Sequence, residues 1–270
     1  MRLKEKWRAA GGEWALVTGA CSGIGLAIAE RLASLGYNIA VADIDAGGLH
    51  RAELGITERY GVEVRGMEMD LARMESAGRL HDWCVRERIE PLILVNNAGV
   101  FIYNDMLDTD AGRIEKMIGL HVLTVSMLCR LFGEDMARRG RGYILNMSSY
   151  SMWMPWPGLA LYSATKSYIR NFSRAVSYEM REKGVGVTTV LPAGVTTGLY
   201  GLAENLQRTG KKLGILLTPE KTAEVSLAAM FRRRRQYVPG FLMRMVLPLV
   251  KVLPAWTIRL ARRKTLRFQK

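Results

Sequence analysis

A glycine-rich segment near the N-terminus constrains the fold of this chain more than any other feature. An apolar run at residues 14–18 leads into a turn with three glycines, and a helical apolar pattern then continues to Gly36. A second apolar run, residues 38–43, ends in Asp43. Glycines between a strand and a helix allow close approach of a pyrophosphate, and an acid about 20 residues further on reaches ribose hydroxyls. This order predicts a dinucleotide-binding βαβ unit.

Apolar, β-rich runs recur along the chain, with helical patterns between them. The runs lie at residues 14–18, 38–43, 62–69, 92–96, 142–147 and 185–191. Such alternation predicts right-handed crossovers and a parallel sheet with helices on both faces. With 270 residues, 49% of them hydrophobic, the chain can bury one large core. We therefore expect a single-domain α/β protein with a doubly wound Rossmann fold.

Tyr162 and Lys166 are four residues apart, which places them one turn apart on the same face of a helix. A positive charge beside a phenol, whose unperturbed pKa is about 10, favours the phenolate and allows proton exchange near neutral pH. Ser149, thirteen residues before Tyr162, can hydrogen-bond a carbonyl or hydroxyl oxygen. These groups can move a proton but cannot accept a hydride. A redox cofactor is therefore expected.

Several motifs agree in order and spacing with one family. They are Thr18-Gly19-Ala-Cys-Ser-Gly23-Ile24-Gly25, Asp70-Leu71, Asn96-Asn97-Ala98-Gly99, Ser149, Tyr162 with Lys166, and Pro192-Ala-Gly-Val-Thr-Thr197. Over roughly residues 13–200 the chain resembles the short-chain dehydrogenase/reductase family. Residues 142–179 are most similar to the branch of 3-ketoacyl-CoA reductases and hydroxysteroid dehydrogenases. The resemblance implies an NAD(P)-dependent enzyme that acts on a CH–OH or C=O group.

The resemblance also implies a role for each matching residue. Tyr162 is expected to be the general acid/base, Lys166 to lower its pKa and hold the nicotinamide ribose, and Ser149 rather than Ser148 to be the catalytic serine. The implied cofactor contacts are Thr18, Gly19, Ser22, Gly23, Ile24, Gly25, Asp43, Asp70, Leu71, Asn97, Ala98, Gly99, Tyr162, Lys166, Pro192, Val195 and Thr197. Among these, Asp70 corresponds to the adenine contact and Thr197 to the carboxamide contact. A purely structural role remains the alternative for residues 97–99.

Two positions depart from the family pattern. His121 stands where the family usually has an asparagine that supports a proton-relay water. A histidine there can carry a proton itself, and we include it among the candidate catalytic residues, or it can be a satisfied core residue. The usual Pro-Gly pair is Pro192-Ala193, which removes a permissive glycine and predicts an altered loop beside the nicotinamide.

Asp43 predicts a preference for NAD(H), because a carboxylate there accepts hydrogen bonds from both ribose hydroxyls and repels a 2′-phosphate. Residues 20–22 contain no Lys or Arg, and none follows Asp43 directly, although Arg51 could reach from the next helix. NADP(H) remains the alternative cofactor. We expect no metal site, because His50, His81 and His121 lack metal-ligand spacing.

The three cysteines, Cys21, Cys84 and Cys129, are widely spaced and odd in number, so we expect buried thiols in a reducing compartment rather than disulfides. The N-terminal residues are charged and lack the apolar run of a signal peptide. Both features favour a cytoplasmic location.

The positive charge of the chain is concentrated at its C-terminal end. Residues 1–207 contain 23 Lys/Arg and 23 Asp/Glu, whereas residues 208–270 contain 16 Lys/Arg and two Glu. We interpret 1–207 as the nucleotide-binding and catalytic body, and 208–270 as substrate-side helices and a basic amphipathic extension of the same domain. From Arg232 onward there are twelve basic residues and no acid, with apolar residues interleaved at spacings of three and four.

This composition favours peripheral contact with an anionic membrane on its cytoplasmic face. The alternative is a tail that packs its apolar stripe on the body and leaves its charges solvated. Charges and prolines interrupt the tail too often for a transmembrane helix. Nucleic-acid binding is not expected, because no recognisable binding module occurs.

Aromatic and apolar residues follow Ser149 and Thr197, and we expect Trp153, Met154, Trp156 and Tyr200 to contact a hydrophobic, steroid-like or lipid-like substrate. The alternative for these side chains is a subunit contact, since the family commonly forms homodimers and homotetramers. Two other functions are also considered. One is a 3-ketoacyl thioester reductase that uses NADPH, and the other is a catalytically idle nucleotide-sensing or scaffold protein.

Overall fold

The computed structural model of the chain describes residues 7–153, 156–196, 216–251 and 256–258. The longer strands are β1 (Trp14–Thr18), β2 (Asn38–Asp43), β3 (Val64–Glu68), β4 (Pro91–Asn96), β5 (Gly142–Met147) and β6 (Val185–Val190). All six coincide with the predicted apolar runs to within two residues. The sequence did not predict three further strands, β7 (Gly194–Val195), β8 (Leu216–Leu217) and β9 (Gln236–Tyr237). Each has only two residues, too few to show an apolar period.

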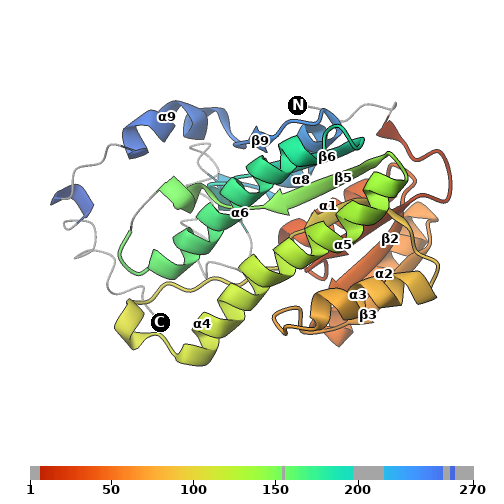
Figure 1. Cartoon of the computed structure of the whole chain (residues 1–270), viewed down its shortest axis with the longest axis horizontal. Coiled ribbons are helices and arrows are strands. Elements are labelled where there is room, and N and C mark those ends of the chain that lie inside the picture. The colour runs from red at the N-terminus through yellow and green to blue at the C-terminus, as the bar shows by residue number, and fades with distance from the viewer. Residues whose placement is uncertain (1–6, 154–155, 197–215, 252–255, 259–270) are drawn as a thin grey trace.

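The helices lie between these strands (Figure 1). They are α1 (Gly23–Ala33), α2 (Ala46–Tyr60), α3 (Ser76–Arg86), α4 (Ala111–Ile118), α5 (Val125–Arg138), α6 (Ala160–Glu179), α8 (Pro219–Phe231) and α9 (Phe241–Lys251). Local chemistry sets several of their ends. The carboxylate of Asp45 caps α2 by accepting the Gly48 N–H, and α2 ends at Gly61, whose φ of +67° suits a glycine.

The main sheet has the order β3-β2-β1-β4-β5-β6-β9, and every pair in it is parallel. The strand order reverses between β1 and β4, and in open α/β sheets ligands bind beyond the strand ends at such a reversal. The predicted fold class, a doubly wound Rossmann fold, is therefore confirmed.

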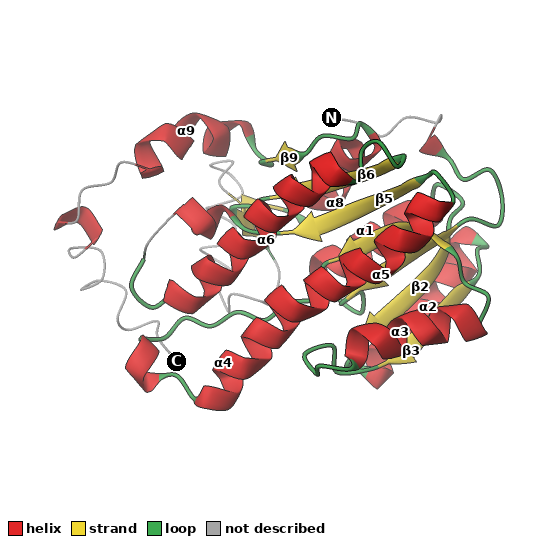
Figure 2. Ribbon diagram, viewed as in Figure 1, coloured by secondary structure: helices red, strands yellow, loops and turns green. Residues whose placement is uncertain are grey.

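Helices cover both faces of the main sheet (Figure 2), and a hydrophobic core lies between the sheet and each layer of helices. One core receives side chains from α1, α2 and α8, and the other receives side chains from α3, α5 and α6. Side chains alternate along β1, so that Ala15 and Val17 face the first core while Trp14 and Leu16 face the second. Strands buried on both faces explain why the sequence shows continuous apolar runs rather than alternation.

Helices α4 and α5 are joined through a π-helical turn over Gly119–Thr124. The whole stretch Ala111–Arg138 is long and apolar enough by composition to cross a membrane, but half of its most apolar window is buried within the fold. Phe132 and Met136 of α5 are fully packed into the second core. The apolarity of this helix is thus accounted for by its place against the sheet.

A chain of buried polar groups ties β4, β5 and α6 together. The amide of Asn96 donates to Asn146 Oδ1 at 2.7 Å, and the Asn146 amide donates to Ser173 Oγ at 2.8 Å. Ser173 in turn donates to the carbonyl of Ile169 at 2.6 Å. A buried polar group stabilises a fold only while its partners are present. This chain therefore fixes α6 against the strand ends from which the site is built.

We predict that Asn146→Leu lowers the free energy of unfolding by about 2–4 kcal/mol, because it leaves Asn96 and Ser173 buried without their partner. Denaturant unfolding measures the change. Asn171→Ala on the exposed side of α6 is the control and is expected to change stability by less than about 0.5 kcal/mol. Equal effects of the two substitutions would show that the polar chain does not hold α6.

Candidate active site

The glycine turn after β1 is required by close backbone contacts. Gly19 has a φ of +65°, and a Cβ there would lie 2.8 Å from the Cα of Ala98. A Cβ on Gly25 would lie 2.0 Å from the Gly19 carbonyl oxygen. Neither position can carry a side chain without movement of the backbone, so glycine is required at both.

Asp43, the last residue of β2, clamps this turn. One carboxylate oxygen accepts the Cys21 N–H at 2.9 Å, and the other accepts the N–H groups of Ile44 at 2.7 Å and Asp45 at 3.2 Å. Cys21 is half-buried beside it, and burial together with the charge of Asp43 raises the pKa of its thiol to about 12. Cys84 and Cys129 are fully buried thiols, as the sequence predicts.

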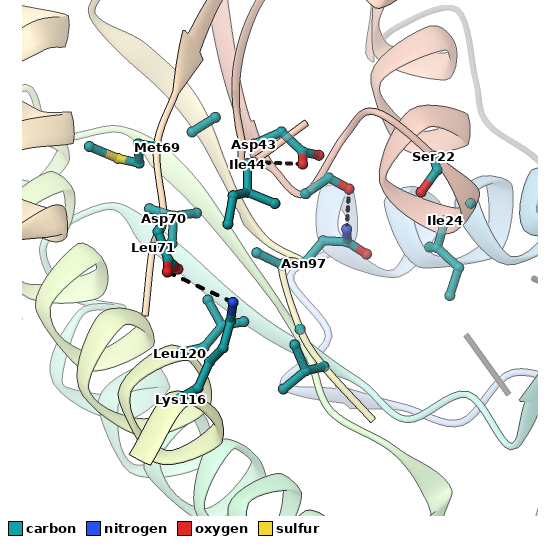
Figure 3. A pocket seen from close by; sticks show the side chains of 16 residues that line it. Ser22, Ile24, Asp43, Ile44, Met69, Asp70, Leu71, Asn97, Lys116 and Leu120 are labelled. Carbon is teal, nitrogen blue, oxygen red and sulfur yellow. Dashed lines mark hydrogen bonds and ion pairs between the residues drawn. The ribbon is translucent and has the colours of Figure 1, made fainter. Parts of the chain in front are cut away.

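A pocket of about 480 Å³ opens between the turn, Asp43 and the end of β4 (Figure 3). Ten of the predicted cofactor contacts line it, namely Gly19, Ser22, Gly23, Ile24, Asp43, Asp70, Leu71, Asn97, Ala98 and Gly99. Six further lining residues carried no motif that could identify them, and these are Ala42, Ile44, Met69, Val100, Lys116 and Leu120. Lys116 of α4 lies with its Nζ 3.8 Å from Asp70 Oδ2. The pocket therefore presents a carboxylate at each of two strand ends and an apolar slot between them.

Thr18 and Asn97 join β1 to β4 below this pocket. Thr18 Oγ1 donates to the Val95 carbonyl at 3.2 Å and accepts the Asn97 and Ala98 N–H groups at 3.0 and 3.1 Å. The Asn97 amide donates to the carbonyls of Thr18 and Gly19. These bonds give both residues a structural role at the floor of the pocket.

Tyr162 and Lys166 both lie on the buried side of α6, within its first two turns. The Lys166 ammonium lies 5.6 Å from the centroid of the Tyr162 ring and donates to the Met147 carbonyl at 3.1 Å. Burial lowers the pKa of Lys166 from 10.5 to about 8. The ammonium is therefore mostly charged at neutral pH and close to titration just above it.

Ser148 and Ser149, directly after β5, have different partners. Ser148 Oγ donates to the backbone carbonyl of Lys166 at 2.7 Å and so ties β5 to α6. Ser149 Oγ accepts the Ser151 N–H at 3.2 Å and lies 2.9 Å from Ser151 Oγ. Because Ser148 is engaged with the backbone, the geometry favours Ser149 as the serine available to a substrate oxygen.

His121 lies fully buried in the π-helical turn, and both of its ring nitrogens are engaged. Nε2 accepts the Val100 N–H at 3.1 Å, which assigns the ring hydrogen to Nδ1, 3.0 Å from Thr165 Oγ1. Thr165 Oγ1 donates to the Tyr162 carbonyl at 2.9 Å. Burial and the Lys166 charge hold the pKa of His121 well below its ordinary value. This geometry favours a neutral positioning residue over the proton carrier considered from the sequence.

Gly99 allows this histidine to approach. A Cβ at Gly99 would lie 2.9 Å from His121 Nε2 and 3.6 Å from Lys166 Nζ. The glycine of the Asn-Ala-Gly motif thus has a steric reason beyond the turn itself, which the sequence alone did not reveal.

The two described members of the predicted substrate wall, Trp153 and Trp156, do not belong to the apolar cluster around Tyr162. Trp153 and Trp156 line a separate apolar pocket with Ala160, Ala164 and Ser167. Those positions lie on a different side of α6 from Tyr162, Thr165 and Lys166. For the two tryptophans the geometry therefore favours the alternative of a subunit contact. Met154, Thr197 and Tyr200 lie outside the described residues.

The side chains that do surround Tyr162 come mainly from the segment after β4. Phe101 meets the Tyr162 ring edge-on with centroids 5.0 Å apart. The other apolar members of this cluster are Val100, Ile102, Met117, Leu159 and Leu161. Pro192, whose carbonyl accepts the Tyr150 N–H at 2.9 Å, and buried Val195 lie after β6 and do not line the pocket at the glycine turn.

We predict that the free energy of unfolding of the wild type, compared with that of Lys166→Met, rises with pH. Because the pKa of Lys166 is lowered, the unfolded chain binds more protons than the folded chain between about pH 8 and 10.5. The free energy of unfolding therefore increases as the pH rises through that window, and this gain is lost again as the pH falls to 8. The difference between wild type and variant should move by about 2 kcal/mol in favour of wild type between pH 7.5 and 9.5. Denaturant unfolding at several pH values measures it, and a constant difference would contradict a buried ammonium.

Residues 13–206 match the family described as short chain dehydrogenase. The chain is 37% identical over 201 residues to a very-long-chain 3-oxoacyl-CoA reductase of Anas platyrhynchos, covering 72% of this chain and 63% of the relative. It is 32% identical over 239 residues to very-long-chain 3-oxoacyl-CoA reductase-B of Danio rerio, covering 86% and 74%. A human protein named inactive hydroxysteroid dehydrogenase-like protein 1 is 35% identical over 204 residues, covering 73% and 60%. The chain thus spans less than two thirds of the length of the first of these relatives.

Solved structures agree with the observed fold. A 7β-hydroxysteroid dehydrogenase superposes with a TM-score of 0.82 at 25% identity, covering 93% of this chain and 95% of that one. A short-chain dehydrogenase from Sphingobium yanoikuyae, solved in complex with NADPH, superposes with a TM-score of 0.76 at 26% identity, covering 90% and 97%. The relatives carry the names of the branch to which residues 142–179 pointed. The chain belongs to the short-chain dehydrogenase/reductase family.

Proposed function

We propose that the protein is an NAD(P)-dependent oxidoreductase that interconverts a hydroxyl and a carbonyl group. The observation that carries this proposal is the buried Tyr162–Lys166 pair on α6, in a fold whose strand reversal holds a nucleotide-sized pocket. Hydrogen bonds of Lys166 to Met147 and Ser148 attach this pair to the end of β5, directly before Ser149. The residues fit a dinucleotide, because the glycine turn has no room for side chains and Asp43 and Asp70 stand at adjacent strand ends. When bound, a nicotinamide supplies or accepts the hydride.

In this mechanism the side chains of the protein transfer the proton. Tyr162 donates its hydroxyl proton to the carbonyl oxygen during reduction and takes it back during oxidation. The Lys166 ammonium stabilises the negative charge that develops on the phenol oxygen, and Ser149 holds the substrate oxygen by a hydrogen bond. His121 and Thr165 keep α6 and the segment after β4 in register, so that the tyrosine stays in place.

The preferred cofactor in this proposal is NAD(H). Asp43 carries a negative charge at the ribose position, and the nearby Arg51 guanidinium lies 3.5 Å from Asp45 rather than at Asp43. In the described part of the pocket the only basic side chain is Lys116, which lies beside Asp70. NADP(H) is the alternative, supported by the NADPH complex of a similar structure.

The proposed substrate is a hydrophobic alcohol or ketone, steroid-like or lipid-like. The apolar cluster around Tyr162, with Phe101 against its ring, supports this class. The names of the relatives favour, as an alternative, a 3-ketoacyl thioester that is reduced with NADPH. A catalytically idle protein is the alternative of another class, since one relative is named inactive. The presence here of Ser149, Tyr162 and Lys166 argues against it.

The proposal includes assembly and location. Apolar side chains are exposed on α5 and α6, among them Met127 at 38% and Tyr168 at 37%, and they support a homodimer or homotetramer. We also propose that the enzyme is cytoplasmic and attaches peripherally to the cytoplasmic face of a membrane. The exposed apolar side of α9 supports this attachment. No nucleic-acid partner is proposed.

Tyr162→Phe is expected to lower kcat by about 10²–10⁴-fold, because the proton donor is lost while the ring still packs on Phe101. Cofactor affinity, measured by the fluorescence of reduced nicotinamide, is expected to change by less than about threefold. Tyr168→Phe, on the exposed side of the same helix, is the matched control and should keep full activity. A Tyr162→Phe enzyme with more than a tenth of wild-type turnover would refute the assigned role.

Steady-state kinetics with both cofactors tests the choice of cofactor. The catalytic efficiency is expected to be at least about tenfold higher with NADH than with NADPH, because Asp43 repels a 2′-phosphate. Asp43→Asn removes the charge, keeps one of the two oxygens that accept backbone N–H groups, and should narrow the preference for NADH. A tenfold advantage of NADPH in the wild type would overturn the assignment while leaving the reaction class intact.

A further inference from the structure

Five arginines and one side of α9 form a single exposed surface. The arginines are the consecutive run Arg232–Arg235 between α8 and β9, together with Arg244 of α9. Phe241, Leu242 and Met245 complete the surface on α9. We call this set of residues the arginine–α9 surface. Its elements follow one edge of the molecule, from α8 past β9 to α9 (Figure 1).

Aromatic rings hold each arginine of the run. The guanidinium of Arg232 lies 5.6 Å from the centroid of Trp7, that of Arg233 lies 5.3 Å from Tyr143, and that of Arg235 lies 4.5 Å from Tyr178. A ring orients a guanidinium without neutralising it, and the N–H groups at the edge of the plane stay available to an anion. Arg233 also donates to the Gly184 carbonyl at 3.0 Å, and Arg244 of α9 donates to the Gly240 carbonyl at 3.3 Å.

One buried tyrosine connects the arginine run to α9. The Tyr237 ring has Arg234 at 6.0 Å and Arg244 at 5.7 Å from its centroid, and Arg244 also lies 6.0 Å from the Phe241 ring. Tyr237 belongs to β9, which pairs with β6 at the edge of the sheet. The first turns of α9 are therefore attached to the arginine run through contacts that continue into the core.

The charges of this surface lack acidic partners. In the described part of the chain no carboxylate forms an ion pair with Arg232–Arg235 or Arg244, whereas Arg65, Arg130 and Arg141 each pair with a glutamate. From Arg232 to the end of the sequence there is no acidic residue at all. Five uncompensated positive charges on one edge create a field that attracts an anionic surface.

Large apolar side chains stand exposed beside these charges. Phe241 is 73% exposed, Met245 is 63% exposed and Leu242 is 41% exposed. They occupy positions i, i+4 and i+1 of α9 and so share one side of the helix. A nucleic acid or a free phosphate would neutralise the arginines but leave these side chains in water. A bilayer with anionic headgroups accepts both, because apolar side chains enter below the phosphates that the guanidiniums bind.

We propose that the arginine–α9 surface binds the phosphates of anionic phospholipids and lays this edge of the enzyme on the bilayer. The inference rests on the proposed peripheral attachment and deepens it by naming the residues that make the contact. It transfers the docking role from the C-terminal tail as a whole to a site that the core of the fold holds in place.

Co-sedimentation with vesicles tests the proposal. Wild type should bind vesicles of phosphatidylcholine with about 30% phosphatidylserine, bind phosphatidylcholine alone far more weakly, and lose binding as salt rises from about 0.05 to 0.5 M. The variant Arg234→Gln/Arg235→Gln/Arg244→Gln should partition about 100-fold more weakly, since each basic residue at such a surface contributes about a fivefold gain. Arg31→Gln/Arg79→Gln/Arg86→Gln removes the same charge from the exposed sides of α1 and α3, and is expected to change binding by less than about threefold.

Two further variants separate charge from folding. The variant Arg234→Lys/Arg235→Lys/Arg244→Lys keeps the charge without the planar stacking, and should retain most of the binding. Phe241→Asp, at a position exposed to solvent, should weaken binding by at least about tenfold while the melting temperature stays unchanged.

Each outcome bears on a different part of the account. If the wild type does not bind anionic vesicles, both the proposed peripheral attachment and the proposed role of the arginine–α9 surface are wrong. Anionic binding that survives the triple glutamine variant would overturn the arginine–α9 surface but leave attachment through the rest of the tail. Turnover of a soluble substrate is expected to be the same in all variants, so these failures are distinct from a failure of the proposed reaction.

Discussion

The buried ammonium of Lys166 lies at the C-terminal end of β5, where its Nζ donates a hydrogen bond to the Met147 carbonyl oxygen at 3.1 Å. An ammonium is costly to bury, and burial alone lowers its pKa to about 8. The arrangement persists because other contacts fix both ends of it. Ser148 ties the backbone of Lys166 to the end of β5, and the Asn96–Asn146–Ser173 chain fixes β5 against α6. The same contacts set the position of Tyr162, one turn earlier on α6.

Burial, together with the nearby charge of Lys166, explains why His121 is neutral. Its ring is fully buried near Lys166, and a second positive charge there would be repelled, so the neutral ring serves as a hydrogen-bonding strut between Val100 and Thr165. Gly99 is needed for the His121 ring to fit, because a Cβ there would lie 2.9 Å from Nε2. The family asparagine usually found at this position supports a proton-relay water, whereas both nitrogens of His121 are committed to protein groups. In the proposed mechanism Tyr162 therefore transfers the proton, and Ser149 holds the substrate oxygen by a hydrogen bond.

Much of the fold and of the nucleotide pocket could be predicted from the sequence, because both depend on local patterns. Continuous apolar runs marked six strands, and the order of strand, glycine turn, helix and acid located Gly19 and Asp43 at one edge of the sheet. Lys116 and Phe101 could not be found in this way, since their roles depend on which helix or loop the tertiary fold brings to the pocket. Trp153 and Trp156 follow Ser149 closely in sequence, but they line a separate pocket on another side of α6, and their contact with substrate stays a prediction. The basic and amphipathic character of the tail can be read from the sequence. The aromatic contacts of Arg232–Arg235 cannot, because the rings lie far apart along the chain.

In the proposed reaction Tyr162, with Lys166 beside it, transfers the proton while a hydride reaches a hydrophobic carbonyl. This reaction is tested most directly by a turnover screen of steroid, acyl thioester and aromatic carbonyls with NADH and NADPH, with binding of each reduced cofactor followed by its fluorescence in the same samples. We expect the wild type to bind a reduced cofactor and to oxidise it while reducing at least one apolar carbonyl. Tight cofactor binding with no oxidation by any member of the panel would contradict it and favour a nucleotide-sensing protein.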